Sequence, residues 1–174
     1  MSTIKPALPN CYWVMPGQML AGEHPSVADK SETHARLERL REARINYFVD
    51  LTEQGEMPDY REFLPPQSHY LRFPIRDMDV PSDVREMQVL LVRIQRALAL
   101  KRRIYIHCRA GIGRTGLVVG CYLAQHGLDG PAALAALNEL WLSCERSKVW
   151  PTVPQTDEQA DYIRSWHRQK RLRD

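Results

Sequence analysis

The sequence has few cysteines and no long apolar run, and these two shortages exclude several classes of protein. Its four cysteines form no C-x-x-C pair and no zinc-like spacing with histidines, so neither a disulfide framework nor a metal site is expected. No stretch approaches the roughly 18 uninterrupted apolar residues of a membrane span, and stable membrane insertion is not expected. The first residues also lack an apolar run of signal-peptide length, which predicts a cytoplasmic protein.

Internal repeats, low-complexity stretches and a strong charge of either sign are also missing. The formal net charge of +3 is mild, and no basic stripe carries the interleaved aromatics of nucleic-acid binding, so no nucleic-acid partner is expected. At 44% hydrophobic residues, residues 1–174 are predicted to form a single domain with a core. The basic residues within 167–174 are expected to finish a helix, where cations suit the negative end of the dipole.

The most informative segment is HCRAGIGRTG, residues 107–116, in which five residues separate Cys108 from Arg114. Small residues allow consecutive backbone N–H groups to turn inward as an anion-binding nest, and a following helix adds its positive end. Arg114 can grip two phosphate oxygens and does not lose its charge. Because the features that hold a phosphate also stabilise a thiolate, Cys108 is the candidate nucleophile.

The segments around this loop have the order that the chemistry needs. RRIYIHC, before the loop, is typical of a strand, and LVVGCYLAQH, after it, has helical character. Strands followed by a helical C-terminal half predict an α/β fold, with a mostly parallel central sheet flanked by helices and Cys108 at the carboxyl end of a strand. The predicted strands are 11–15, 18–21, 45–51 and 68–74, and the predicted helices are 31–43, 82–101, 114–126, 131–143 and 156–170.

HCRAGIGRTG resembles, without a gap, the signature of the cysteine-dependent protein tyrosine phosphatase superfamily, in its compact dual-specificity or archaeal-like branch. The resemblance implies the phosphatase fold and a two-step reaction, in which Cys108 attacks phosphorus and water then hydrolyses the phosphocysteine. It also implies that Thr115 hydrogen-bonds the sulfur and that His107 orders the loop rather than acting as a base. The implied phosphate-binding loop consists of Cys108, Arg109, Ala110, Gly111, Ile112, Gly113 and Arg114.

A second segment, FPIRDMDVPS at residues 73–82, resembles the family's acid loop. A phenolate or alkoxide leaving group needs a proton donor opposite the nucleophile, and a carboxylic acid on a movable loop meets that need. The resemblance makes Asp77 the general acid, with Asp79 as the alternative. Larger tyrosine-specific members carry Trp-Pro-Asp here, where this chain has Ile-Arg-Asp.

A third segment, VPQTDEQ at residues 153–159, resembles the glutamine loop of the same family. The resemblance implies that Gln155 positions the attacking water and that Gln159 supports it. The four-residue spacing places both glutamines on one face of a helix that starts near Thr156.

Together these segments imply a phosphatase acting on phosphotyrosine in a phosphorylated protein, and also on phosphoserine and phosphothreonine if the pocket is shallow. Two alternatives remain: a phosphoinositide or inositol-polyphosphate phosphatase, in which Arg109 meets a second phosphate, and a phosphate-binding module without turnover. No metal or organic cofactor is implied. The sequence leaves open the oligomeric state and whether Cys121 or Cys144 forms a redox pair with Cys108.

Overall fold

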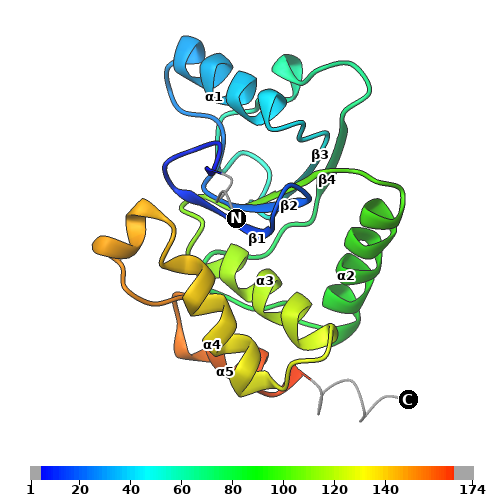
Figure 1. Cartoon of the computed structure of the whole chain (residues 1–174), viewed down its shortest axis with the longest axis vertical. Helices are drawn as coiled ribbons and strands as arrows, with labels where there is room; N and C mark the ends of the chain where they lie inside the picture. The colour runs from blue at the N-terminus through cyan, green and yellow to red at the C-terminus, as the bar shows by residue number, and fades with distance from the viewer. Residues whose placement is uncertain (1–4, 167–174) are drawn as a thin grey trace.

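The structure is a computed structural model, and it describes residues 5–166. Strands and helices alternate before a helical C-terminal half (Figure 1), which confirms the predicted α/β class. The basic residues of 167–174 lie outside the described residues. The described strands are β1 (Cys11–Met15), β2 (Met19–Gly22), β3 (Tyr47–Asp50), β4 (His69–Arg72) and β5 (Ile104–His107). The described helices are α1 (Lys30–Glu42), α2 (Val84–Ala99), α3 (Gly113–Gln125), α4 (Gly130–Trp141) and α5 (Asp157–Arg164), with the short 3-10 helices η1 (Arg61–Phe63) and η2 (Glu145–Lys148).

The five strands form one sheet in the order β1-β2-β5-β3-β4, and only β1 and β2 run antiparallel. The central strand β5 ends at His107, which lies in register with Gly22 of β2 and with Asp50 of β3. The loops that leave these strands therefore meet at one edge of the sheet. In open α/β sheets ligands bind at this carboxyl edge, and Cys108 lies there.

Both faces of the sheet are covered. Ile104 and Ile106 of β5 contribute to the larger core under the helices α2 to α5, whereas Tyr105 contributes to a second core under α1. This alternation is the two-residue period of a strand. A sheet buried on both faces is typical of parallel strands joined by helices.

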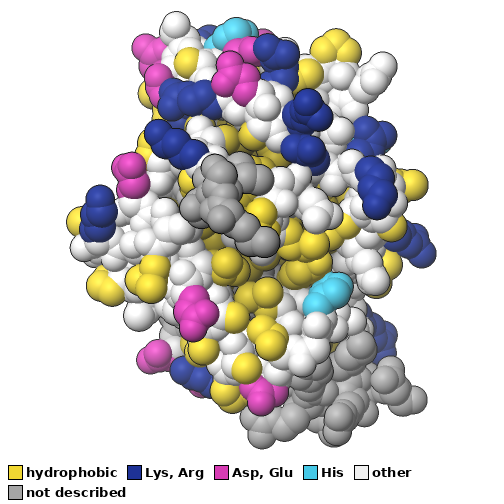
Figure 2. Space-filling view, viewed as in Figure 1, with side chains coloured by type: hydrophobic (Ala, Val, Ile, Leu, Met, Phe, Trp, Pro, Cys, Tyr) yellow, Lys and Arg dark blue, Asp and Glu magenta, His cyan; other side chains and the backbone are white. Residues whose placement is uncertain are grey.

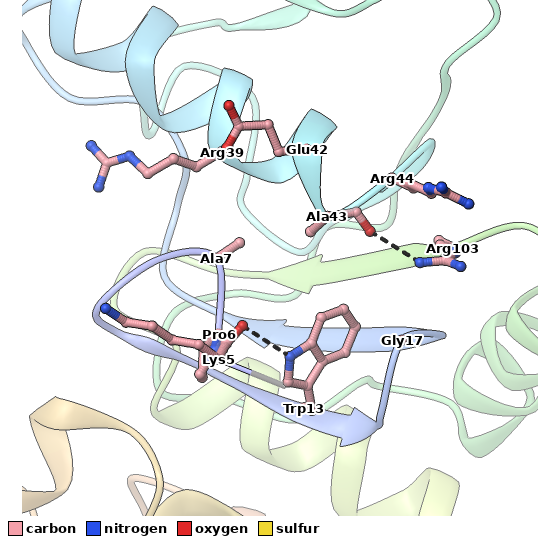
Figure 3. A pocket seen from close by; sticks show the side chains of 10 residues that line it. All are labelled: Lys5, Pro6, Ala7, Trp13, Gly17, Arg39, Glu42, Ala43, Arg44 and Arg103. Carbon is pink, nitrogen blue, oxygen red and sulfur yellow. Dashed lines mark hydrogen bonds between the residues drawn. The ribbon is translucent and has the colours of Figure 1, made fainter. Parts of the chain in front are cut away.

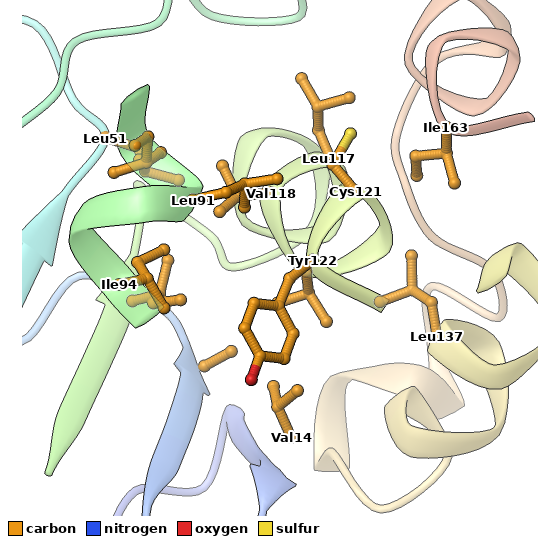
Figure 4. Close-up of a cluster of buried hydrophobic side chains, with 14 of the residues drawn as sticks. Val14, Leu51, Leu91, Ile94, Leu117, Val118, Cys121, Tyr122, Leu137 and Ile163 are labelled. Carbon is orange, nitrogen blue, oxygen red and sulfur yellow. The ribbon is translucent and has the colours of Figure 1, made fainter. Parts of the chain in front are cut away.

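Helix α3 lies at the centre of the larger core and is buried on almost every side. Figure 4 shows its side chains between those of α2, such as Leu91 and Ile94, and those of the later helices, such as Leu137 and Ile163. This packing fixes the direction of α3, so that its positive N-terminal end points into the loop after β5. No helix among the described residues is long and apolar enough to cross a membrane.

The structure corrects one helix end. Helix α2 begins after Asp83 rather than after Ser82, because the Asp83 carboxylate accepts the Arg85 N–H at 2.9 Å and satisfies a free donor of the first turn. Helix α5 is described over Asp157–Arg164, and the predicted helical residues 167–170 lie outside the described residues.

Candidate active site

The backbone of the loop between β5 and α3 requires a glycine at one position. Gly111 has φ of 77°, a conformation that side chains other than glycine rarely adopt. A Cβ at this position would also lie 2.5 Å from the carbonyl carbon of Gly22. Glycine is therefore required at position 111 for both its conformation and its close approach to β2.

The carbonyl groups of the loop are held from outside. The Arg109 oxygen accepts the backbone N–H of His24 at 3.0 Å, and the Ala110 oxygen accepts the guanidinium of Arg146 from η2. Arg146 also pairs with the buried carboxylate of Glu23 at 3.1 Å, which fixes its position. Because C=O and N–H point in opposite directions across a peptide plane, outward carbonyls leave N–H groups for an anion inside the loop.

Cys108 follows β5 directly and is 3% exposed. The other three cysteines are buried as neutral thiols: burial raises the pKa of Cys11 to about 12, that of Cys121 well above its ordinary value, and that of Cys144. A neutral thiol is a poor nucleophile, so these three cysteines serve packing. All four cysteines are free in the structure.

Arg114, in the first turn of α3, is 1% exposed, and its guanidinium is held by a carboxylate that the motifs do not contain. Glu56, on the loop after β3, accepts Nη1 at 2.8 Å and Nη2 at 2.6 Å. Nη1 also donates to the Ile75 oxygen at 3.1 Å. Burial acts to lower the pKa of Arg114, but Glu56 and Cys108 raise it above its ordinary value.

The two nitrogens bound by Glu56 form one edge of the guanidinium. Nε, on the next edge, has no hydrogen-bond partner among the described residues although it is buried. Within the described part of the chain, Nη2 has one further partner, the Asp77 carboxylate at 3.1 Å. The Nε–Nη2 edge thus has the donors for two oxygens of one phosphate.

The two candidate acids have different environments. The Asp77 side chain is 45% exposed and reaches Arg114 from the acid loop. The Asp79 side chain instead accepts the N–H of the next residue, Val80, at 2.8 Å. The structure brings Asp77, not Asp79, to the guanidinium.

Both glutamines of the third segment lie against Gly113, at the end of the loop. A Cβ on Gly113 would meet the Gln155 side chain at 3.0 Å and that of Gln159 at 3.1 Å. Gln159 is buried, forms a capping box with Thr156, and donates to the Asp79 carbonyl oxygen at 3.0 Å. The Gln159 side chain therefore connects the acid loop, α5 and the start of α3.

Under the loop, His107 is fully buried, and its Nε2 shares a hydrogen bond of 2.7 Å with the Tyr60 hydroxyl. Burial and the neighbouring His24 lower the pKa of His107 to about 3, so the ring is neutral at pH 7. Beside it the Asp50 carboxylate accepts the hydroxyls of Thr52 at 2.6 Å and Tyr70 at 2.7 Å. Although burial acts to raise it, these donors and His24 hold the pKa of Asp50 well below its usual range.

The spacing of this cluster would also suit a metal ion. The atoms that could ligate a metal in His24, Asp50 and His107 all lie within 4.8 Å of one another. The Asp50 oxygens already accept the hydrogen bonds of Thr52 and Tyr70, and Asp50 pairs with Arg72 at 3.3 Å. These contacts make the cluster a structural support for β3 and β5.

Thr115 differs from the expectation. Its hydroxyl is buried and donates to the Gly22 oxygen at 3.4 Å rather than to the sulfur of Cys108. The residue adjoins the loop, because it lies in the first turn of α3 directly after Arg114.

Sequence reasoning missed Glu56, Arg146 and Tyr60, three side chains that hold the catalytic segments in place. None of them lies in the three motifs, and each reaches the site from a loop or short helix far away in the sequence. Glu56 stands in the polar stretch TEQGEMPDY, where a carboxylate has no distinguishing pattern.

Comparison with known proteins agrees with this geometry. Residues 8–169 match the family described as Swiss Army Knife protein, DSP-PTPase phosphatase domain. The chain belongs to this family. The family predicted from HCRAGIGRTG is thereby confirmed.

Relatives by sequence include protein 067L of Invertebrate iridescent virus 3, provisionally named a tyrosine phosphatase, which is 33% identical over 145 residues. That match covers 74% of this chain and 59% of the viral protein. The dual specificity protein phosphatase CDC14AB of Danio rerio is 30% identical over 122 residues, which cover 66% of this chain and 19% of that protein. The chain thus spans less than two thirds of either relative.

Solved structures share the fold. The kinase associated phosphatase with its catalytic cysteine replaced by serine gives a TM-score of 0.73 at 19% identity, over 98% of this chain and 99% of that one. Tk-PTP in its active form gives a TM-score of 0.69 at 22% identity, over 92% of this chain and 97% of that one.

The low pKa of His107 predicts how stability depends on pH. The pKa of the His107 ring is near 6.5 in the unfolded chain and about 3 in the folded chain, so between these pH values only the unfolded chain binds a proton there. The neutral ring therefore contributes fully to stability above pH 6.5. As the pH falls below 6.5, we expect the free energy of unfolding to decrease by about 1.4 kcal/mol per pH unit. Urea unfolding from pH 7 to about pH 4.5, above the range in which Asp50 contributes, measures the slope.

His107→Gln should flatten this slope, whereas replacement of the exposed His126 by glutamine serves as the matched control. An equal slope in wild type and in His107→Gln contradicts the assignment.

The contact between Glu56 and Arg114 predicts a second effect. Glu56→Gln keeps the shape but turns one of two acceptors into a donor, so the guanidinium loses its bidentate partner and shifts. We expect kcat/KM on an aryl phosphate to fall by about tenfold to a hundredfold, since misplacement of catalytic groups by about 1 Å has effects of this size. The exposed Glu53→Gln, on the same loop, is the control, and equal rates for the two variants contradict the role.

Proposed function

We propose that this domain hydrolyses phosphotyrosine in proteins, with activity also on phosphoserine and phosphothreonine, through a phosphocysteine at Cys108. The observation that carries the proposal is the state of Arg114. Its outer edge is held by Glu56, while Nε is buried and has no hydrogen-bond partner among residues 5–166. Cys108 is close enough to raise the pKa of this guanidinium. A buried donor left unpaired is costly, and a phosphate oxygen satisfies it.

In the first step the Cys108 thiolate attacks phosphorus, a sulfur–phosphorus bond forms, and the bond to the leaving oxygen breaks. Loop N–H groups, the dipole of α3 and the Nε–Nη2 edge of Arg114 stabilise the phosphoryl oxygens. A phosphate on this edge competes with Asp77 for Nη2. The displaced Asp77 carboxylate takes up a proton from water and delivers it to the leaving oxygen.

In the second step water attacks the phosphocysteine, its proton passes to Asp77, and inorganic phosphate leaves as the thiolate is restored. Gln155 is proposed to position this water because its side chain lies against Gly113 at the loop. Gln159 supports the arrangement through its bond to the acid loop. We propose that Thr115 stabilises the departing thiolate by turning from the Gly22 oxygen to the sulfur.

A protein substrate is favoured over an inositol polyphosphate by the state of Arg109. Its Nε pairs with the Glu56 carboxylate at 3.3 Å, so its charge is partly satisfied before any second phosphate arrives. The remaining loop side chains, of Ala110 and Ile112, are neutral. A phosphotyrosyl peptide compared with inositol phosphates on one preparation distinguishes these substrates. We place the activity in the cytoplasm, where thiols stay reduced.

Replacement of the nucleophile tests the mechanism. Cys108→Ser should reduce turnover of p-nitrophenyl phosphate to background, because a serine hydroxyl is not ionised at neutral pH. The variant should still bind inorganic phosphate, since the loop N–H groups and Arg114 remain. Wild-type turnover by this variant excludes a phosphocysteine, and Cys121→Ser, in the core, serves as the control.

The acid assignment predicts a difference between two neighbouring aspartates. Asp77→Asn should lower kcat by about a hundredfold or more and flatten the basic limb of the pH–rate profile, because general acids contribute about this much. The loss should be greater on phenyl phosphate than on p-nitrophenyl phosphate, whose leaving group needs less protonation. Asp79→Asn should retain both the rate and the limb. The opposite result moves the acid to Asp79.

A further inference from the structure

A group of cations at the amino-terminal edge of the sheet, opposite Cys108, is not used by the reaction. They follow α1 or lie on and after the last turns of α2. None forms an ion pair with any residue of the described chain. We call them the edge cations: Arg44, Arg93, Arg96, Lys101, Arg102 and Arg103. Figure 2 shows Lys and Arg side chains gathered on the side where α1 and α2 end.

All the edge cations except Lys101 line three neighbouring hollows. The first, of about 480 Å³, lies between the N-terminal hairpin and α1 and contains Arg44 and Arg103 (Figure 3). The second, of about 280 Å³, has Arg44, Pro65, Pro66 and Arg102 in its wall. The third, of about 330 Å³, contains Arg102 with Arg93 and Arg96 of α2. Because Arg44 and Arg102 each line two hollows, the three adjoin one another, and we call this row of hollows the basic track.

The backbone places two of these cations where glycine is usual. After α1, the Arg44 N–H bonds to the Arg41 oxygen and the Ile45 N–H to the Leu40 oxygen. After α2, Lys101 and Arg102 repeat the same pair of bonds. Arg44 and Lys101 therefore occupy the left-handed position of this helix-ending motif, with φ of 61° and 60°. A cation at both sites brings positive charge to this edge of the sheet despite the cost of the backbone conformation, and Arg44 lines the track itself.

The residues that line the track include eight cations and one acid, Glu42. Two of the cations, Arg39 and Arg41, pair with glutamates of α1, which leaves the others available for an external anion. We propose that the basic track binds an extended acidic segment of a protein partner, such as the phosphoprotein substrate itself. Where the acidic partner is the phosphoprotein substrate, the inference rests on the proposed function.

The shape and the ring contacts favour an acidic polypeptide over other polyanions. A planar membrane cannot reach the half-buried Arg102 and Arg103 within the hollows, whereas an extended chain can. Proteins that bind single-stranded nucleic acid typically offer open aromatic faces on which the bases stack. In the track Trp13 is 9% exposed, and Tyr47 and His69 stack on each other at 5.8 Å.

The position of the track gives it a role separate from chemistry. Arg103 and Cys108 lie just before and just after β5, five residue steps apart. At about 3.3 Å per step, the track is separated from Cys108 by roughly 17 Å. A substrate held at the track by one segment would present a phosphorylated residue to Cys108 at an increased local concentration.

A binding experiment without any phosphorylated residue tests the proposal. The probe is a fluorescent Glu- and Asp-rich peptide of about twelve residues, which spans up to roughly 40 Å when extended. Its affinity is measured by anisotropy with saturating inorganic phosphate, so that the active site is occupied. The track variant Arg44→Gln, Arg96→Gln, Arg102→Gln is compared with the control variant Lys30→Gln, Arg85→Gln, Arg164→Gln, which loses the same net charge elsewhere.

We expect the track variant to weaken binding by about tenfold or more and the control variant by less than about twofold. Added salt should weaken binding to the wild type. Equal losses in both variants, or no binding by the wild type, overturn the proposal. Tighter, track-dependent binding of phosphatidylserine vesicles or of oligo-dT overturns it in favour of a lipid or nucleic-acid partner.

Turnover of p-nitrophenyl phosphate, measured on the same variants, separates this proposal from the proposed function. The track variant should keep wild-type turnover and a wild-type circular dichroism spectrum. Loss of peptide binding with turnover intact supports the track. Peptide binding by a wild-type protein that lacks turnover supports the track and contradicts the proposed function.

Discussion

The buried guanidinium of Arg114 is the constraint on which the rest of the site depends. A charge removed from water needs an opposite charge, and removing one partner of such a buried pair costs about 3–5 kcal/mol. Glu56 supplies the opposite charge, but it takes the outer edge of the guanidinium and leaves Nε without a partner. The protein thus balances the charge of Arg114 and still keeps an edge for phosphate.

The loop that faces Arg114 depends on contacts from all sides. Arg146 and the His24 backbone hold its carbonyls outward, and Gln159 joins it to the acid loop. Below the loop, the fully buried His107 has a pKa of about 3. Its ring is therefore neutral at pH 7 and does not form an ion pair with the Asp50 carboxylate. Preorganised donors of this kind do not need to reorient during the reaction, which is the main source of electrostatic catalysis.

The two edges of the sheet have different characters. The carboxyl edge gathers the nucleophile, Arg114 and the carboxylates that balance its charge. The amino edge gathers cations that no described acid balances. This separation follows from parallel strands, because every β-to-α loop lies on one edge and every α-to-β connection on the other. Changes at the amino edge are therefore expected to leave the position of Cys108 unchanged.

The sequence by itself determined the fold class, the loop from Cys108 to Arg114 and the two supporting segments, because each is a local pattern whose residues are close in the chain. It also placed most strands and helices, since their apolar periodicity is local. Tertiary structure alone decided that Asp77 rather than Asp79 reaches Arg114, that Glu56 is its partner, and that Thr115 donates to Gly22. It also joined cations from α1 and α2 into one track. These contacts connect residues tens of positions apart, and a side chain's direction depends on how the elements pack.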